Sequence, residues 1–174
     1  MESRGYFFHN CTVGPNGFCM VAEHTPDRKH LVFSTFDPVK GRGRELWRMD
    51  TERFDPPCWN QSRDGKLLAV VTPNEKERQI RIVSLPGGTF HDLTVKGWSG
   101  INNIDWSADG NGLLVESKSP RGSTLLRVDL KGNAQPIWDS RYAFDTYALA
   151  SADGRHLVIA DGIVDSNIWI LENF

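Results

Sequence analysis

The first residues that could do chemistry are two carboxylates near the end of the sequence, Asp161 and Asp165. They flank Gly162, Ile163 and Val164, and such a pair could bind a cation or take part in acid and base catalysis. A solvated loop between two strands explains the same residues without any ligand. We favour the loop, and we expect no metal at this pair.

Candidate nucleophiles and phosphate loops lack their usual context. A serine hydrolase of the α/β type needs a Gly-x-Ser-x-Gly motif between a strand and a helix, and the sequence has none. The five histidines are scattered, so they give no reason to propose a Ser-His-Asp triad. The stretch Gly41-Arg42-Gly43-Arg44 is typical of a hairpin tip, because no helix is expected after it. We therefore predict that the chain is not an enzyme and needs no cofactor.

The cysteines could be proposed as metal ligands. Cys11 and Cys19 stand near His9 and His24, but their spacing lacks the short ligand pairs of structural zinc sites. With Cys58 they make an odd and sparse set in a chain large enough to form a core, which predicts reduced, mostly buried thiols. Reduced thiols favour a cytoplasmic compartment over a periplasmic one.

The overall charge and hydropathy give no reason to expect nucleic acid or a membrane as partner. The 20 basic and 22 acidic residues give a formal net charge of -2, which predicts neither nucleic acid nor an anionic membrane as partner. The longest apolar runs, at 67–71 and 168–171, are far shorter than the roughly 20 residues that span a bilayer. The first ten residues lack the basic and apolar pattern of a secretory signal. We expect neither a signal peptide nor membrane insertion.

An internal repeat predicts the elements that would position any site. One phrase recurs around Asp27, Asp64, Asp109 and Asp153, at intervals near the period of about 40 residues of a four-stranded propeller blade. The phrase spans residues 24–33, 61–70, 106–115 and 150–159. Asp-Gly tolerates the positive φ of a tight hairpin turn, and the Ser or Thr before it can bond the local backbone. Arg28 replaces the glycine in the first copy, which predicts a different or strained turn there.

Segments of alternating polarity follow each copy and predict further strands. They lie at 45–50, 79–85, 124–130 and 167–171. No helical period is present, so we predict an all-β fold: a single β-propeller domain over 1–174 with four four-stranded blades. The blades are expected at about 13–57, 58–99, 100–145 and 146–174, and an N-terminal strand at 5–12 is expected to complete the last one.

Two ways of closing the ring satisfy this count of strands, and a third arrangement leaves it open. The chain could close as a small four-bladed ring, or two chains could join their open edges in an eight-bladed homodimer. It could also be the C-terminal part of a longer propeller.

The repeat phrase resembles a known family. Residues 61–69 and 151–157 look like the SPDGKxLAF signature of the WD40-like PD40 repeats in the TolB propeller, with Ser-Arg or Ser-Ala in place of Ser-Pro. Segments 117–126 and 166–174 are similar to the ends of TolB-like propellers in large bacterial regulators. The pattern of WD40 proper is absent apart from Trp138-Asp139. The resemblance implies a propeller that acts as a protein-binding or sensor module, although related propellers also occur in prolyl oligopeptidases.

Loops on one face of a propeller provide the candidate site. The loops at 37–44, 73–78, 118–122 and 162–166 are expected to share a rim. This rim would bind an ionic protein partner, or a small anion at the central channel, through six charged residues: Arg42, Arg44, Lys118, Arg121, Asp161 and Asp165. Ordinary solvated loops would carry similar charges. Two other functions remain open, an accessory propeller of a prolyl-oligopeptidase-like hydrolase and a propeller that binds a small ligand.

Overall fold

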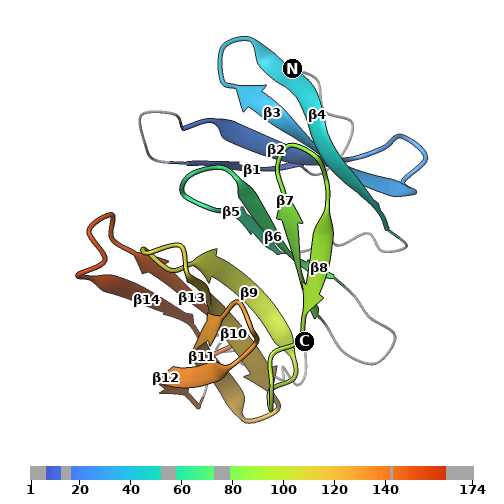
Figure 1. Ribbon diagram of the computed structural model, residues 1–174. Coiled ribbons are helices and arrows are strands. Elements are labelled where there is room, and N and C mark those ends of the chain that lie inside the picture. Colours follow the sequence, from blue (N-terminus) through green and yellow to red (C-terminus); the bar gives the residue numbers. More distant parts are fainter. Residues whose placement is uncertain (1–6, 13–16, 52–57, 73–78, 142, 164–174) are drawn as a thin grey trace, which may run out of the picture.

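The computed structural model describes residues 7–12, 17–51, 58–72, 79–141 and 143–163, and these form strands and turns (Figure 1). The predicted all-β fold is confirmed. The strands are β1 (Phe7–Cys11), β2 (Cys19–His24), β3 (His30–Asp37), β4 (Gly41–Asp50), β5 (Trp59–Gln61), β6 (Leu67–Thr72), β7 (Gln79–Ser84), β8 (Phe90–Leu93), β9 (Ile101–Trp106), β10 (Gly112–Ser119), β11 (Gly122–Asp129), β12 (Ala134–Ser140), β13 (Asp145–Ala150) and β14 (Leu157–Gly162).

The strands form four antiparallel meanders, each of them a propeller blade. Blade 1 is β1–β4, blade 2 is β5–β8, blade 3 is β9–β12, and blade 4 is β13 with β14 in the described part of the chain. The third strand that we expect at 167–171 lies outside the described residues. Successive blades meet through their first strands β1, β5, β9 and β13. This stacking of meanders is the propeller arrangement that the repeat predicts.

The Asp-Gly phrase forms the same turn in blades 2, 3 and 4. The serine hydroxyls of Ser62, Ser107 and Ser151 donate to the side chain of the aspartate two residues later, at 2.6–2.7 Å. The glycine after each aspartate has a φ of 68–69°. This left-handed conformation explains the preference for glycine. In the first copy Arg28 also has a positive φ, 59°, which costs a residue with a side chain about 1 kcal/mol.

Blade 1 differs from the expected arrangement by one strand. The turn at residues 25–29 joins its second and third strands, whereas the matching turns of the other blades join the first and second. The N-terminal strand, which we expected to complete blade 4, pairs instead with β2, where Phe8 lies opposite Ala22. The predicted closing strand is therefore wrong, because β1 is the first strand of blade 1.

The turn after β1 is the true counterpart of the Asp-Gly turns. Thr12 N donates to the Phe18 carbonyl at 3.1 Å, and Phe18 N donates to Thr12 Oγ1 at 2.9 Å. Ser62 and Leu67 make the same two bonds at 2.8 and 2.9 Å. The structural repeat therefore begins at Thr12, Ser62, Ser107 and Ser151.

Each blade buries one face against its neighbour. We call the face turned toward the next blade in sequence the forward face and the opposite one the rear face. The forward face of blade 2, with Ala69 and Val71, joins the rear face of blade 3, with Leu113 and Val115, in one apolar cluster. A second cluster joins blades 1 and 2, and a smaller third one joins blades 3 and 4.

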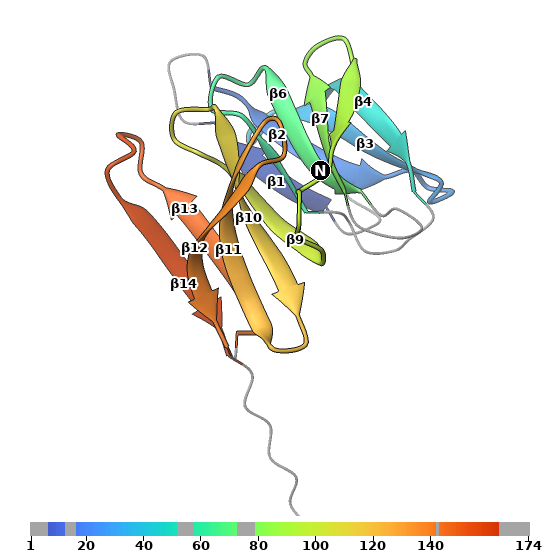
Figure 2. The same ribbon diagram turned by 60° about the horizontal axis from the view of Figure 1, so that its bottom comes forward.

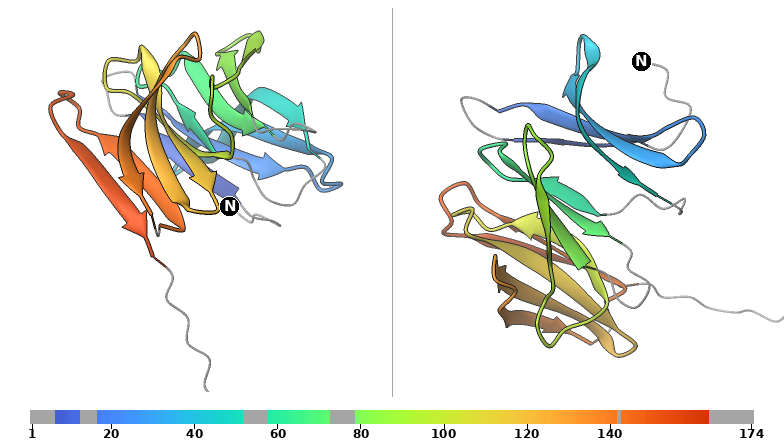
Figure 3. Two further views of the ribbon diagram at one scale, coloured as in Figure 1. Left: turned by 90° about the horizontal axis from the view of Figure 1, so that it is seen from below. Right: turned by 45° about the vertical axis from the view of Figure 1, so that its right-hand side comes forward.

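The described blades follow one another in an open arc (Figures 2 and 3). Blade 1 stands at one end and blade 4 at the other. The turns after β5, β9 and β13 lie on the same side, at the left of Figure 1. There the guanidinium of Arg63 in blade 2 donates to the carbonyls of Ser151 and Ala152 in blade 4. This contact joins blade 2 directly to blade 4 at that end.

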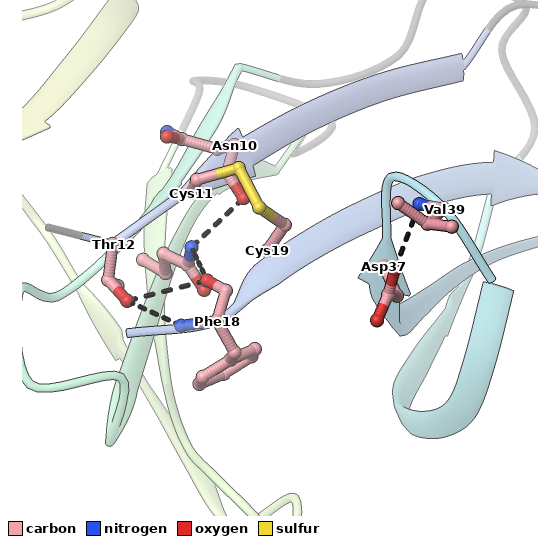
Figure 4. The surroundings of a disulfide bond; sticks show 8 residues. Asn10, Cys11, Thr12, Phe18, Cys19, Asp37 and Val39 are labelled. Carbon is pink, nitrogen blue, oxygen red and sulfur yellow. Dashed lines mark hydrogen bonds between the residues drawn. A yellow bond between two sulfur atoms is a disulfide. The ribbon is translucent and has the colours of Figure 1, made fainter. Parts of the chain in front are cut away.

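Two of the three cysteines are not the reduced thiols that we expected. Cys11 and Cys19 lie directly opposite each other on β1 and β2 and form a disulfide (Figure 4). The prediction failed because it considered the number of cysteines and not the hairpin that brings these two together. Cys58 is not in a disulfide, and its thiol donates to Asn103 Oδ1 at 3.3 Å. The cysteines therefore no longer favour a reducing compartment. The described residues include no helix that is long and apolar enough to cross a membrane.

Candidate functional site

The structure does not gather the predicted charged rim on one face. Arg42 and Arg44 follow the turn between the third and fourth strands of blade 1, whereas Lys118 and Arg121 flank the turn between the second and third strands of blade 3. These two kinds of turn lie at opposite ends of an antiparallel meander. The difference follows from the shift of one strand in blade 1. Whether any of these residues binds a partner stays a prediction.

The basic residues of that prediction differ in their contacts. Arg42 Nη1 lies 2.9 Å from Glu23 Oε2, and Arg44 is exposed on β4. Lys118 pairs with the Asp145 carboxylate, and its ammonium lies 4.8 Å from the centre of the Phe144 ring. Arg121 is exposed in the β10–β11 turn. Two of the four cations are therefore paired with carboxylates of the same chain.

Of the two acidic residues of the prediction, only Asp161 lies in the described part of the chain. Asp161 Oδ1 accepts from Thr146 Oγ1 at 2.9 Å, and Asp161 Oδ2 accepts from Trp138 Nε1 at 3.1 Å. Burial raises the pKa of Asp161, but these hydrogen bonds outweigh it and keep the pKa below its usual value. Asp165 lies outside the described residues. Asp161 therefore acts as an anchor between β12, β13 and β14.

A more connected set of polar side chains lies on the first strands of blades 1, 2 and 3. One position, two residues before the turn serine or threonine, holds Asn10, Asn60 and Asp105. Asn10 Nδ2 donates to Asn60 Oδ1 at 2.6 Å, and Asn60 Nδ2 donates to Asp105 Oδ1 at 2.7 Å. We call this chain of hydrogen bonds the inner ladder. Blade 4 has Leu149 at the same position, so the ladder ends at Asp105.

The next residue on these strands connects the same blades through the backbone. Gln61 Nε2 donates to the Asn10 carbonyl at 3.0 Å, and Trp106 Nε1 donates to the Asn60 carbonyl at 3.1 Å. Blade 4 has Ala150 at this position, and an alanine side chain cannot donate. Blades 1, 2 and 3 are thus joined by one repeated pattern, and blade 4 is attached by other contacts.

Glu116 on β10 provides the main polar attachment of blade 4. Its side chain is fully buried. Oε1 accepts from Ser123 Oγ at 2.8 Å and from the Thr146 backbone N–H at 2.7 Å. Oε2 accepts from Asn102 Nδ2 at 2.9 Å and from Asn103 Nδ2 at 2.7 Å. Four donors fill the acceptor positions of a carboxylate, so Glu116 is a structural group that ties three strands of blade 3 to β13.

Asp105 is the less satisfied carboxylate of the two. The Asn60 side chain and the Trp106 backbone N–H, at 2.7 Å each, both donate to Oδ1. Burial raises the pKa of Asp105 to about 6, against the lowering effects of these hydrogen bonds and of the Arg63 charge. Asp105 lines a cavity of about 270 Å³ between blades 3 and 4. A carboxyl group in such a place can accept a proton or a hydrogen bond near neutral pH.

The forward face of blade 4 is apolar and exposed. Ala148 and Ile159 pack toward blade 3, so their neighbours in the two paired strands face the other way. Among these neighbours, Tyr147, Leu149 and Val158 are exposed by 50%, 61% and 63%. Tyr147 and Leu149 also reach the edge of the cavity between blades 3 and 4. We call these three residues the blade 4 patch. The described residues place no strand over it.

Sequence reasoning missed the ladder, Glu116 and the patch. The ladder had a usable signal in the sequence, because an asparagine or aspartate stands two residues before the turn serine or threonine in three repeats. Correct alignment of blade 1 would have shown it. Glu116 gave no such signal, since its partners come from three other strands and only the fold brings them together.

The stacked meanders and the ladder along their first strands define the class of the protein, an all-β propeller. No protein-family model matches the chain, and no curated protein matches it. Among solved structures, a prolyl endopeptidase is similar, with a TM-score of 0.57 and 17% identity over 88% of this chain and 26% of that chain. The chain thus spans about a quarter of the endopeptidase. At this identity the likeness shows the fold alone.

Two further solved structures are more distant. A putative 6-phosphogluconolactonase from Bacteroides fragilis has a TM-score of 0.47 and 14% identity over 88% of this chain and 51% of that chain. A protein from Lactobacillus plantarum has a TM-score of 0.44 and 15% identity over 89% of this chain and 60% of that chain. Neither adds to the argument on function.

Proposed function

We propose that the chain is a non-enzymatic protein-binding propeller, and that the blade 4 patch is its binding surface. Its partner is a second copy of the chain, which packs its own blade 4 patch against the first. The observation that carries the proposal is the exposure of Leu149 at a position where the other blades hold the ladder residues Asn10, Asn60 and Asp105.

The forward faces of blades 1, 2 and 3 are each covered by the next blade. Blade 3 covers the forward face of blade 2. Blade 4 covers the forward face of blade 3, where Leu114 and Leu125 are buried. Blade 4 keeps an apolar forward face without such a cover among the described residues. Sheets with apolar faces pack face to face at about 10 Å, so another sheet is the natural partner.

The other end of the arc does not offer a matching apolar face. Leu31 and Phe33 face blade 2, so Val32 and its register partners Glu23 and Arg48 lie on the rear face of blade 1. Two ion pairs stand there, Arg42 with Glu23 and Arg48 with Glu45. Such a charged surface is typical of the capped end of a repeat protein. This asymmetry supports pairing of blade 4 with blade 4, in which both chains use the same patch.

The test is the solution mass by light scattering in a dilution series. We expect about twice the chain mass of 19.6 kDa for the wild type. Val158→Glu places a charge in the patch and should give the monomer mass. Val39→Glu is the matched control, because Val39 is 93% exposed in blade 1, and it should leave the dimer intact. A wild type that stays monomeric at about 100 µM, well above the micromolar range of ordinary complexes, would exclude the pairing.

The resemblance of the repeat phrase to TolB-like repeats supports a binding role in a bacterial regulator. The small net charge of -2 gives no reason to propose nucleic acid or an anionic membrane as the partner. The likeness to a prolyl endopeptidase supports a second candidate, an accessory propeller of a larger hydrolase. In that case another blade of the same polypeptide would cover the blade 4 patch. Sequencing the parent gene distinguishes the two, because only the second candidate requires a catalytic domain beside this segment.

A further inference from the structure

We propose that the cavity between blades 3 and 4 binds a small organic amine, whose ammonium group is held by Asp105 and whose hydrocarbon part lies on the apolar wall. Tyr147 and Leu149 of the blade 4 patch also line this cavity, but the proposal does not depend on the pairing. The argument rests on three features of the cavity, which are its size, its free acceptor and its shortage of donors.

The size and lining of the cavity fit a short amphipathic molecule. Its volume is about 270 Å³, and its apolar wall includes Ile104, Leu114, Leu125 and Ala148. A cavity of about 150 Å³ holds benzene, so this one has room for a chain of about five to eight carbons with a polar head. A mostly apolar cavity with a few polar groups is the usual form of a small-molecule site.

Asp105 has an acceptor to spare. Among the described residues, both donors to this carboxylate, Asn60 and the Trp106 backbone, bond to Oδ1. These bonds fix the side chain, and they leave Oδ2 for a ligand. The ladder behind Asn60 adds to this rigidity, because Asn10 holds the Asn60 amide in turn.

The amides and the other carboxylate that line the cavity are already in use. Asn60 Nδ2 donates to Asp105, and Asn103 Nδ2 donates to Glu116. Glu116 itself is filled by four donors. The donors left to a ligand are the second N–H of Asn60 and the Tyr147 hydroxyl, whereas Asp105 Oδ2 is a charged acceptor, so a ligand that donates to Asp105 is favoured. An ammonium group satisfies this need and gains a charge-assisted hydrogen bond.

The charges around Asp105 set the pH range of binding. Arg63 approaches it from the β5–β6 turn, Glu116 from β10, and Asp145 with its partner Lys118 and Tyr147 from the side of β13. Burial raises the pKa of Asp105 to about 6, so the carboxylate is mostly ionised at pH 7 and mostly protonated at pH 5. The affinity for an ammonium ion should therefore rise about tenfold from pH 5 to pH 7.

Isopentylamine is the probe, and isopentanol is its neutral isostere. Binding is followed by NMR titration of the side-chain amides of Asn60 and Asn103, together with calorimetry, at pH 5 and pH 7. We expect saturable binding of the amine at pH 7, with an affinity at least tenfold higher than that of the alcohol. Asp105→Asn should bring the amine down to the affinity of the alcohol. Asp109→Asn, in the exposed turn after β9, is the control and should bind like the wild type.

Two results would overturn the proposal: equal affinity for amine and alcohol, or undiminished amine binding by Asp105→Asn. The comparison of pH 5 with pH 7 uses only the wild type, so the test does not depend on the folding of a variant. Val158 does not line the cavity. Amine binding by the Val158→Glu monomer would therefore separate this site from the proposed pairing.

Discussion

Replacing Asp105 with asparagine should stabilise the protein at neutral pH and flatten its response to pH. Burial raises the pKa of this carboxyl group from 3.8 to about 6 in the folded protein. A group with a raised pKa in the folded state favours folding while it is protonated, fully so below its unfolded pKa, and this contribution is lost as the pH rises through 6. The difference of about two pKa units corresponds to about 3 kcal/mol of unfolding free energy.

Asparagine is a suitable substitute because its oxygen can still accept from Asn60 and from the Trp106 backbone. It carries no charge to bury. We therefore expect Asp105→Asn to be more stable than the wild type by up to about 3 kcal/mol at pH 7.5 and by little at pH 4.

Urea unfolding of both proteins at several pH values between 4 and 7.5 provides the measurement. The difference between the two free energies of unfolding is the useful quantity, because the other titrating groups contribute equally to both proteins and cancel. A difference that does not change with pH would show that Asp105 has an ordinary pKa. A variant that is less stable at pH 7.5 would show that the carboxylate is stabilised by its surroundings, which is contrary to our reasoning.

Two further pairs of substitutions test a buried carboxylate and a turn glycine. Glu116→Gln should cost about 2–4 kcal/mol in urea unfolding, because an NH₂ group would then face two donors in place of an acceptor oxygen. The exposed Glu45→Gln should cost under about 1 kcal/mol, and an equal loss for both would contradict the role of Glu116. Gly65→Ala should cost more than Gly110→Ala, although both glycines have a φ of 69°. A Cβ at Gly65 would come within 2.5 Å of the Phe18 ring, whereas one at Gly110 meets nothing within 4 Å. We expect about 1 kcal/mol for Gly110→Ala, and equal losses would exclude the Phe18 contact.

The local sequence predicted the turns and strands well. Asp-Gly after serine specifies its hairpin through short-range bonds, so three of the four phrases marked the same turn correctly. The phrase at Asp27 also forms a turn, but its place in the blade is different. Local chemistry defines a turn without saying which two strands it joins. The dipeptide Asn16-Gly17, which is typical of hairpins, was the signal for the missing copy.

The candidate site was much less predictable. The charged residues of the predicted rim were chosen from loops, and loop positions depend on strand order, which was off by one in blade 1. The inner ladder depends on the side-by-side placement of first strands from different blades. Such contacts join residues 45 and 50 positions apart, and they follow from the repeat only when its register is correct.

The ladder has a direction, and the direction restricts the order of the blades. An asparagine side chain both accepts and donates, so a blade that has it can stand in the middle of a series. An aspartate carboxylate only accepts, so a blade that has it must come last. Asn10, Asn60 and Asp105 are in the one order that makes every bond. A second copy of the blade that contains Asn60 could be inserted without breaking the series, because its asparagine would both accept and donate. The series ends at the blade that contains Asp105, because its carboxylate has no hydrogen to donate to a further blade.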